Sequence, residues 1–383
     1  MIGGLGNLEK LVVVLSPEPI ETYPDQCLRN LNKDSACRAC EQACPLEAIT
    51  LERYPEVDPG ICSGCGVCVS VCPTGALDLA RNSALKMVGL MAEMLAASKA
   101  KRVAFVCEKN RDRCTADTPV VIFSCLGRLT QPLLLAAASM GATDLWIDTS
   151  VCAGCEFKVS VQWIAAEAGR ARSLLAGSGI ELVISVGPDP PDSFSAEHAE
   201  EAIRSDQLSR RGFLTALVRE AASGALVFSG GFGEDTEAAG AKHVPQNRVI
   251  LATALYSLEK QGARGVTEAS GLVSCPSIGQ GCNVCGDCVT FCPTGALSKV
   301  SRDGTTSIVL TISDCVGCGL CEGLCTQDAV TLRPPEGPVK PMTEVELITY
   351  TLKVCSDCGL EFGTLDDETV CRFCKKRRSI FGI

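Results

Sequence analysis

The stretch "CSGCGVCVSVCPTGALDL", residues 62–79, decides the fold of one part of this chain. Its four cysteines are separated by two, two and three residues, and a Pro-Thr-Gly turn and a short apolar run follow the last of them. Three closely spaced thiolates of such a run hold one 4Fe–4S cube, and the fourth crosses to a neighbouring cube. Gly64 and Gly66 let the backbone fold tightly around the cube. Zinc fits this run poorly, because zinc sites use two separated pairs of ligands.

The same pattern recurs along the chain. A last cysteine, a turn and a strand-like run stand in "CPLEAITL" (44–51), "CPTGALDL" (72–79), "CPTGALSK" (292–299) and "CTQDAVTL" (325–332). Complete runs of four cysteines also begin at Cys282 and at Cys315. Such self-similarity predicts repeated structural units. Residues 24–80 and 275–333 therefore each resemble a two-cluster bacterial ferredoxin, and the resemblance implies two 4Fe–4S cubes at each end of the chain.

The crossing of the fourth cysteine assigns the ligands of the four cubes. Three of the predicted sets come from regular runs: Cys44, Cys62, Cys65 and Cys68; Cys282, Cys285, Cys288 and Cys325; and Cys292, Cys315, Cys318 and Cys321. The remaining predicted set is Cys27, Cys37, Cys40 and Cys72.

The last set includes a substitute ligand. Asp34 stands where the first cysteine of the run belongs, and Cys27 lies seven residues further upstream. We expect Cys27 to complete this set, because thiolate is the ligand that such clusters normally use. The alternative is that the Asp34 carboxylate serves as a weaker, more exchangeable ligand.

Composition limits the class of protein. The chain has 383 residues, 26 cysteines, two histidines and a net charge of −10. The start "MIGGLGNLEK" has no basic segment followed by a long apolar stretch, so the cysteines are expected to be metal-bound thiolates in a reducing cytoplasm. No apolar run reaches the roughly 18 residues of a membrane span. The acidic balance argues against nucleic-acid binding, which needs a basic surface.

The middle of the chain alternates between strand-like and helical segments. Extended runs are expected at 102–107, 120–125, 144–148 and 181–187, and helices at 83–98, 130–140 and 156–177. Apolar strands separated by helices predict a parallel α/β sheet that is covered on both faces.

Five cysteines of this region are expected to converge. They are Cys107, Cys114, Cys125, Cys152 and Cys155, and four of them end or follow predicted strands. The carboxyl ends of strands in an open α/β sheet meet at one edge, where such folds bind ligands. The set suffices for one cluster with one cysteine to spare. The alternative is a redox dithiol of Cys152 and Cys155, because strand, C-x-x-C and helix follow in the order of a thioredoxin.

Residues 100–190 resemble the delta subunit of methyl-viologen-reducing hydrogenase. The similarity rests on these five cysteines, the "CLGR" segment at 125–128 and the Gly141-Ala142 helix end. It implies that the cysteines surround a 2Fe–2S cluster. It also implies electron relay between a redox enzyme and a partner, often a heterodisulfide reductase.

The C-terminal segment carries two further cysteine pairs. Cys355 and Cys358, and Cys371 and Cys374, are C-x-x-C pairs separated by twelve residues. This spacing predicts a tetrahedral zinc ribbon, with rubredoxin-like iron as the alternative. A segment this short has too small a core of its own, so the metal is expected to staple it.

These observations divide the chain and indicate its role. The predicted division is a ferredoxin domain at 1–82, an α/β domain at 83–190, a helical or irregular linker at 191–273, a second ferredoxin domain at 274–340 and a zinc-ribbon tail at 341–383. The sequence has no nucleophile–base pair and no dinucleotide fingerprint. We therefore expect a non-catalytic electron-transfer subunit of an anaerobic hydrogenase, heterodisulfide-reductase or formate-dehydrogenase type complex. Its partners would be the other subunits of that complex, with a ferredoxin or a flavin-containing subunit as further candidates. The alternative outside electron transfer is a protein that senses oxygen or redox state.

Overall fold

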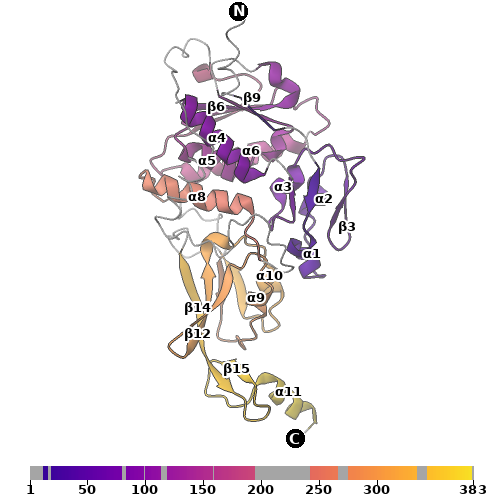
Figure 1. Ribbon diagram of the computed structural model, residues 1–383, viewed down its shortest axis with the longest axis vertical. Coiled ribbons are helices and arrows are strands. Elements are labelled where there is room, and N and C mark those ends of the chain that lie inside the picture. Colours follow the sequence, from indigo (N-terminus) through magenta and orange to yellow (C-terminus); the bar gives the residue numbers. More distant parts are fainter. Residues whose placement is uncertain are drawn as a thin grey trace, which may run out of the picture.

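The structure is a computed structural model. It describes residues 12–15, 19–79, 83–98, 100–113, 119–157, 159–194, 242–265, 275–333 and 343–381. Figure 1 shows the parallel-sheet domain near the N-terminus, one ferredoxin domain at its side and the second below it, with the C-terminal segment at the far end.

The first ferredoxin domain is made of short elements around a small core. Its helices are α1 (Leu28–Leu31), α2 (Ala39–Ala43) and α3 (Val67–Val71), with a 3₁₀ turn at Pro24–Gln26. Two antiparallel strand pairs complete it: β2 (Ile20–Thr22) with β5 (Leu77–Leu79), and β3 (Ile49–Leu51) with β4 (Pro55–Val57). Two cysteines, Cys40 and Cys68, belong to the core that Ile49, Leu51 and Leu77 form. So small an apolar core leaves the cysteine sites a large share in holding the domain together.

The middle domain is a five-stranded parallel sheet with the strand order β1-β7-β6-β8-β9. Its strands are β1 (Val12–Leu15), β6 (Arg102–Cys107), β7 (Val120–Phe123), β8 (Asp144–Asp148) and β9 (Val183–Gly187). The predicted parallel α/β domain is therefore confirmed. β1 was not predicted: it comes from the N-terminal segment and forms the edge of the sheet beside β7, with Val12 opposite Val120.

The strands alternate between two apolar clusters, because successive side chains of a strand point to opposite faces. The larger cluster contains Phe105 and Phe123 together with buried side chains of α4 (Ala84–Ser98), α5 (Gln131–Ser139), α6 (Val159–Leu175) and α8 (Gln246–Lys260). The smaller one contains Val106 and Ile122, and there the Trp146 ring meets Phe194 with centroids 6.0 Å apart. Among the described residues, the four long helices all pack on one face of the sheet. On the other face, Phe194 packs with side chains of the strands.

Helix α8 comes from the range that the sequence assigns to a helical or irregular linker. It packs against α5 and α4, and Leu258, fully buried, belongs to the larger cluster of the middle domain. Its N-terminal end also meets the 3₁₀ turn Ile312–Asp314 of the second ferredoxin domain. In Figure 1, α8 accordingly lies between the other middle-domain helices and that ferredoxin domain.

The second ferredoxin domain repeats the first with a longer hairpin between its two cysteine runs. It contains α9 (Asp287–Thr290) and α10 (Leu320–Gly323), and β10 (Cys275–Ile278) pairs with β13 (Val330–Arg333). The longer hairpin consists of β11 (Leu297–Arg302) and β12 (Thr305–Thr311), and it turns at Asp303 and Gly304, which both have positive φ. Mixed α/β architecture with a ferredoxin domain at each end of the parallel-sheet domain agrees with the predicted fold class.

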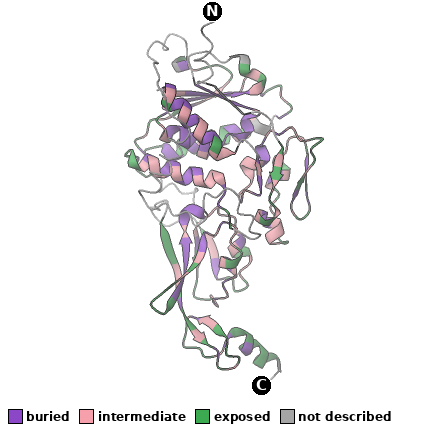
Figure 2. Cartoon of the chain, viewed as in Figure 1, coloured by how far each residue is buried: buried purple, intermediate pink, exposed green. Residues whose placement is uncertain are grey.

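The C-terminal segment is joined to this hairpin through a sheet. β14 (Glu344–Val354) pairs with β12, and its last residues pair with β15 (Glu361–Thr364). Helix α11 (Arg372–Phe381) ends the described chain. Much of this segment is exposed (Figure 2), so it has little apolar core of its own. No helix among the described residues is long and apolar enough to cross a membrane.

Candidate iron–sulfur and metal sites

The first ferredoxin domain has two pockets, and each is lined by one predicted cysteine set. Cys44, Cys62, Cys65 and Cys68 line one pocket, and Cys27, Cys37, Cys40 and Cys72 line the other. The helices position the thiols: Cys40 lies on α2 and Cys68 on α3, and the next cysteine of each run caps the helix. The crossed sets come together because those two capping residues, Cys44 and Cys72, face the pocket of the other run.

Backbone amides face the sulfurs of both pockets. Ala48 N–H donates to Cys44 Sγ at 3.3 Å and Ala76 N–H donates to Cys72 Sγ at 3.2 Å. Such hydrogen bonds favour the thiolate form. Burial has the opposite effect and favours the neutral thiol. It raises the pKa of Cys40 to about 12, and the nearby thiol of Cys72 adds to this. A bound metal supplies the positive charge that would keep such a buried thiol deprotonated.

Cys27 and Asp34 differ in position. Cys27 is buried and lines the pocket with Cys37, Cys40 and Cys72. Asp34 is exposed, is absent from the lining of that pocket, and its N–H donates to Asn32 Oδ1 at 3.1 Å.

The second ferredoxin domain brings its predicted sets together in the same crossed way. Burial raises the pKa of Cys288 to about 11, with further effects of the neighbouring thiols Cys285, Cys282 and Cys325. Burial raises the pKa of Cys321 to about 12, and the nearby thiols of Cys318, Cys315, Cys292 and Cys288 add to this. Cys325 has the same amide contact as Cys44 and Cys72 although Thr326 follows it: Ala329 N–H donates to its Sγ at 3.3 Å.

Four cysteines of the middle domain meet at the carboxyl edge of the sheet. Cys107 ends β6, Cys125 follows β7, and Cys152 and Cys155 follow β8. Burial raises the pKa of Cys152 to about 11, and Cys107, Cys125 and Cys155 are the thiols that add to it. The fifth predicted ligand, Cys114, lies outside the described residues.

Polar groups surround this middle site. Gly127 N–H donates to Cys125 Sγ at 3.4 Å, and Lys109 Nζ lies 3.7 Å from Cys155 Sγ. The buried Asp148 at the end of β8 accepts hydrogen bonds from Asn110 Nδ2 at 2.5 Å and from Ser150 N–H at 2.9 Å. Helix α6 begins at Val159, three residues later than the sequence predicted, so its N-terminus does not directly follow Cys155.

Several of the cysteine sites are neighbours of one another. Burial raises the pKa of Cys65, and among its causes is the neighbouring Cys125 of the middle site. Cys40 in turn adds to the raised pKa of Cys68, so the two pockets of the first ferredoxin domain are neighbours. Cys288 acts in the same way on Cys321 in the second ferredoxin domain.

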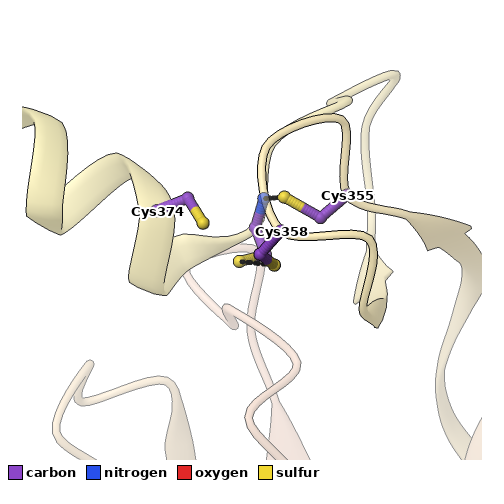
Figure 3. A group of neighbouring side chains, drawn as sticks. Cys355, Cys358 and Cys374 are labelled. Carbon is purple, nitrogen blue, oxygen red and sulfur yellow. Dashed lines mark hydrogen bonds between the residues drawn. The ribbon is translucent and has the colours of Figure 1, made fainter. Parts of the chain in front are cut away.

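The four C-terminal cysteines form a compact group. Their ligand sulfurs all lie within 4.8 Å of one another, and the Sγ atoms of Cys358 and Cys371 are 3.8 Å apart. A tetrahedron with Zn–S bonds of about 2.3 Å has edges of about 3.8 Å, so the group is close to the size of a zinc site. Figure 3 shows Cys355, Cys358 and Cys374 around one point between the end of β14 and α11. The Cys371 N–H hydrogen bond lowers the pKa of Cys355 to about 6, whereas burial raises that of Cys374 to about 12.

Two features near the sites were missed by the sequence analysis. The first is Cys275, which begins β10 and belongs to no motif. Burial raises its pKa, the nearby Cys315 raises it further, and Arg248 lowers it. Arg248 of α8 reaches the loop before Cys315 from a segment without any motif. Only the helical periodicity of residues 246–260 could have indicated that α8 exists.

The fold and these sites define an iron–sulfur protein built around ferredoxin domains. The family described as "4Fe-4S dicluster domain" matches residues 35–76 and 281–329. An uncharacterized ferredoxin of Methanocaldococcus jannaschii is 40% identical over 50 residues, which are 12% of this chain and 81% of that ferredoxin. The chain therefore belongs to the ferredoxin family, through a small part of its length.

A second relative is one component of a larger complex. This relative, a subunit of the ion-translocating oxidoreductase complex of Methanosarcina acetivorans, is 41% identical over 44 residues, 11% of this chain. The chain spans only 17% of the length of that relative. The two dicluster domains imply bound 4Fe–4S clusters and support a role in electron transfer.

Proposed function

We propose that this chain is the electron-transfer subunit of a multi-subunit oxidoreductase and binds four 4Fe–4S clusters, one 2Fe–2S cluster and one zinc ion. The observation that carries the proposal is that cysteine sites neighbour one another: the middle site neighbours Cys65, and the two sites within each ferredoxin domain are neighbours. Neighbouring redox sites give electrons a path through one chain.

The cysteine sets fit the proposed cubes. Each has four thiols and at least one backbone N–H group directed at a sulfur. A bound 4Fe–4S cluster supplies one-electron redox chemistry at a potential that such hydrogen bonds and burial tune. The chain positions the thiolates and limits the access of water.

The middle domain is proposed to act like the delta subunit of methyl-viologen-reducing hydrogenase. Support comes from Cys107, Cys125, Cys152 and Cys155 at one sheet edge, with Cys114 as the fifth candidate. A dithiol of Cys152 and Cys155 would leave Cys107 and Cys125 beside it without a role. The terminal enzyme would be of the hydrogenase, heterodisulfide-reductase or formate-dehydrogenase type, and the partners would be the other subunits of that complex.

The four C-terminal cysteines are proposed to hold structural zinc. All four positions are thiols, so no ligand position is open for substrate. Zinc there would tie α11 to the end of β14, where few apolar side chains are buried.

Metal analysis of the full chain purified without oxygen tests the proposal. We expect about 18 iron atoms and about one zinc per chain, the content of the proposed groups. Paramagnetic resonance of the reduced protein should show 4Fe–4S signals and a separate 2Fe–2S signal. Iron near eight per chain would refute half of the proposed clusters, and protein free of zinc would refute the assignment of the C-terminal site.

A further inference from the structure

The segment before α8 connects the two ferredoxin domains. Pro245 packs on the turn after Cys72, where a Cβ added to Gly75 would lie 3.4 Å from the Pro245 Cβ. His243 N–H donates to Pro293 O, in the turn after Cys292, at 3.2 Å. Gln246 Nε2 also donates to Asp78 Oδ2 of β5 at 2.7 Å. The segment thus touches the turns that follow one cysteine of each ferredoxin domain.

Arg248 lies in the first turn of α8 and reaches the second ferredoxin domain. Its Nε donates to Ser313 O at 2.7 Å, and its Nη2 donates to Ile312 O at 3.0 Å. These carbonyls belong to the 3₁₀ turn that ends immediately before Cys315. Two hydrogen bonds from one planar guanidinium fix the position of its charge.

The first ferredoxin domain receives an arginine at the equivalent run. Arg128, buried in the turn after β7, packs so closely on Gly66 that an added Cβ would lie 2.6 Å from its Cδ. The run with Gly66 and the run that begins at Cys315 are the second runs of their domains. The middle domain therefore presents one arginine to the second run of each ferredoxin domain.

We propose that Arg248 is a positioning residue for electron transfer between the two ferredoxin domains. It would stabilise the reduced state of the site formed by Cys292, Cys315, Cys318 and Cys321. The inference rests on the proposed function. Reduction adds one negative charge to that site, and a fixed cation beside it makes this addition more favourable.

The proposed step moves one electron from one cysteine site of the chain to another. The first ferredoxin domain loses one electron at the site of Cys27, Cys37, Cys40 and Cys72, and the second gains that electron at the site beside Arg248. No bond is broken and no proton is transferred. The fixed charge of Arg248 favours the electron on the site beside it.

Asp314 provides a control of opposite sign. Its carboxyl is buried in the same turn and accepts a hydrogen bond from Ser313 Oγ at 2.8 Å. A negative charge there offsets part of the arginine charge. Removing each charge should therefore move the potential of the site in opposite directions, which a purely structural role does not predict.

The test is a redox titration of the full, cluster-loaded chain, followed by paramagnetic resonance. The signal of the site is assigned by its loss in a Cys318→Ser protein. In Arg248→Gln, we expect the equilibrium constant for reducing this site, relative to the other sites, to fall at least about tenfold, or about 59 mV for one electron. Asp314→Asn should raise it, and Arg248→Lys should keep it within about threefold of the original value because the charge remains.

Lys299→Gln serves as the matched control. The Lys299 ammonium lies near Gly286 of the other run, so its loss should leave the site beside Arg248 unchanged. An unchanged potential in Arg248→Gln would overturn the inference. A shift of the same sign in Arg248→Gln and Asp314→Asn, or loss of the cluster in both Arg248→Gln and Arg248→Lys, would do so too. A wild-type chain without four cubes would instead refute the proposed function.

Discussion

Cys27 is the residue where the repeated pattern is least regular and the geometry most informative. It lines the pocket of Cys37, Cys40 and Cys72, whereas Asp34 is exposed. We predict that Cys27→Ser loses or converts one 4Fe–4S cluster, because one thiolate of that set is removed. Iron analysis and paramagnetic resonance of the anaerobic protein measure this change.

Asp34→Ala is the matched variant for this prediction. It removes the competing carboxylate and leaves the pocket lining intact, so iron content should equal that of the unchanged chain. If Asp34→Ala lost the cluster and Cys27→Ser kept it, the ligand would be Asp34.

At the residue scale the sequence predicted much of the site. The spacing of each run indicates which thiols come together, since a cube needs its ligands within a few ångströms. The backbone was harder to predict. In each of the four repeated segments that begin at Cys44, Cys72, Cys292 and Cys325, the fourth residue has a positive φ. It is glycine in two of them (Gly75 and Gly295) but Glu47 and Asp328 in the others. A glycine pattern alone therefore does not reveal that all four turns are alike.

At the element scale, local patterns identified the strands and helices of the middle domain but not their long-range partners. β1 joins the parallel sheet, and β14 joins the hairpin of the second ferredoxin domain. Both pairings link segments far apart in sequence, which hydrophobic periodicity does not reveal. The Asp303-Gly304 pair is a signal that could have located that hairpin, because Asp-Gly favours its turn type.

The link between β14 and α11 through the four C-terminal cysteines predicts a pH dependence. The pKa of Cys374 is about 12, so its thiol is protonated in the free site near neutral pH and must lose a proton when zinc binds. Zinc affinity should therefore rise with pH, at least about tenfold per unit between about pH 7 and 8. Below the Cys355 pKa of about 6, the Cys355 thiol must lose a proton as well, and the dependence should steepen.

Competition with a chromophoric chelator at several pH values measures this dependence on the full chain. Cys374→Ser provides the comparison, because it removes the thiol that stays protonated longest. An affinity independent of pH across that neutral range would contradict the assignment of Cys374 as a thiolate ligand.

At the scale of the whole molecule, the middle domain is in contact with both ferredoxin domains. Ser124 Oγ donates to Gly64 O of the first at 3.4 Å, and Arg248 donates to the second. The cysteine site at the sheet edge neighbours the first of them, through Cys125 and Cys65. We therefore place this site at one end of the proposed electron path, next to the first ferredoxin domain.

This position makes Cys155 the most direct test of the middle site. Cys155 is only partly buried, and Lys109 Nζ lies 3.7 Å from its sulfur. If it is a cluster ligand, Cys155→Ser should remove a 2Fe–2S resonance and about two iron atoms per chain and leave the 4Fe–4S signals in place.

In the unchanged, reduced protein the Cys155 thiolate should resist alkylation, because it is bound to iron. A redox dithiol would instead alkylate readily after mild reduction, and its mutation would leave the iron content unchanged. The two outcomes exclude each other, because one sulfur cannot be both an iron ligand and a free nucleophile in the same state of the protein.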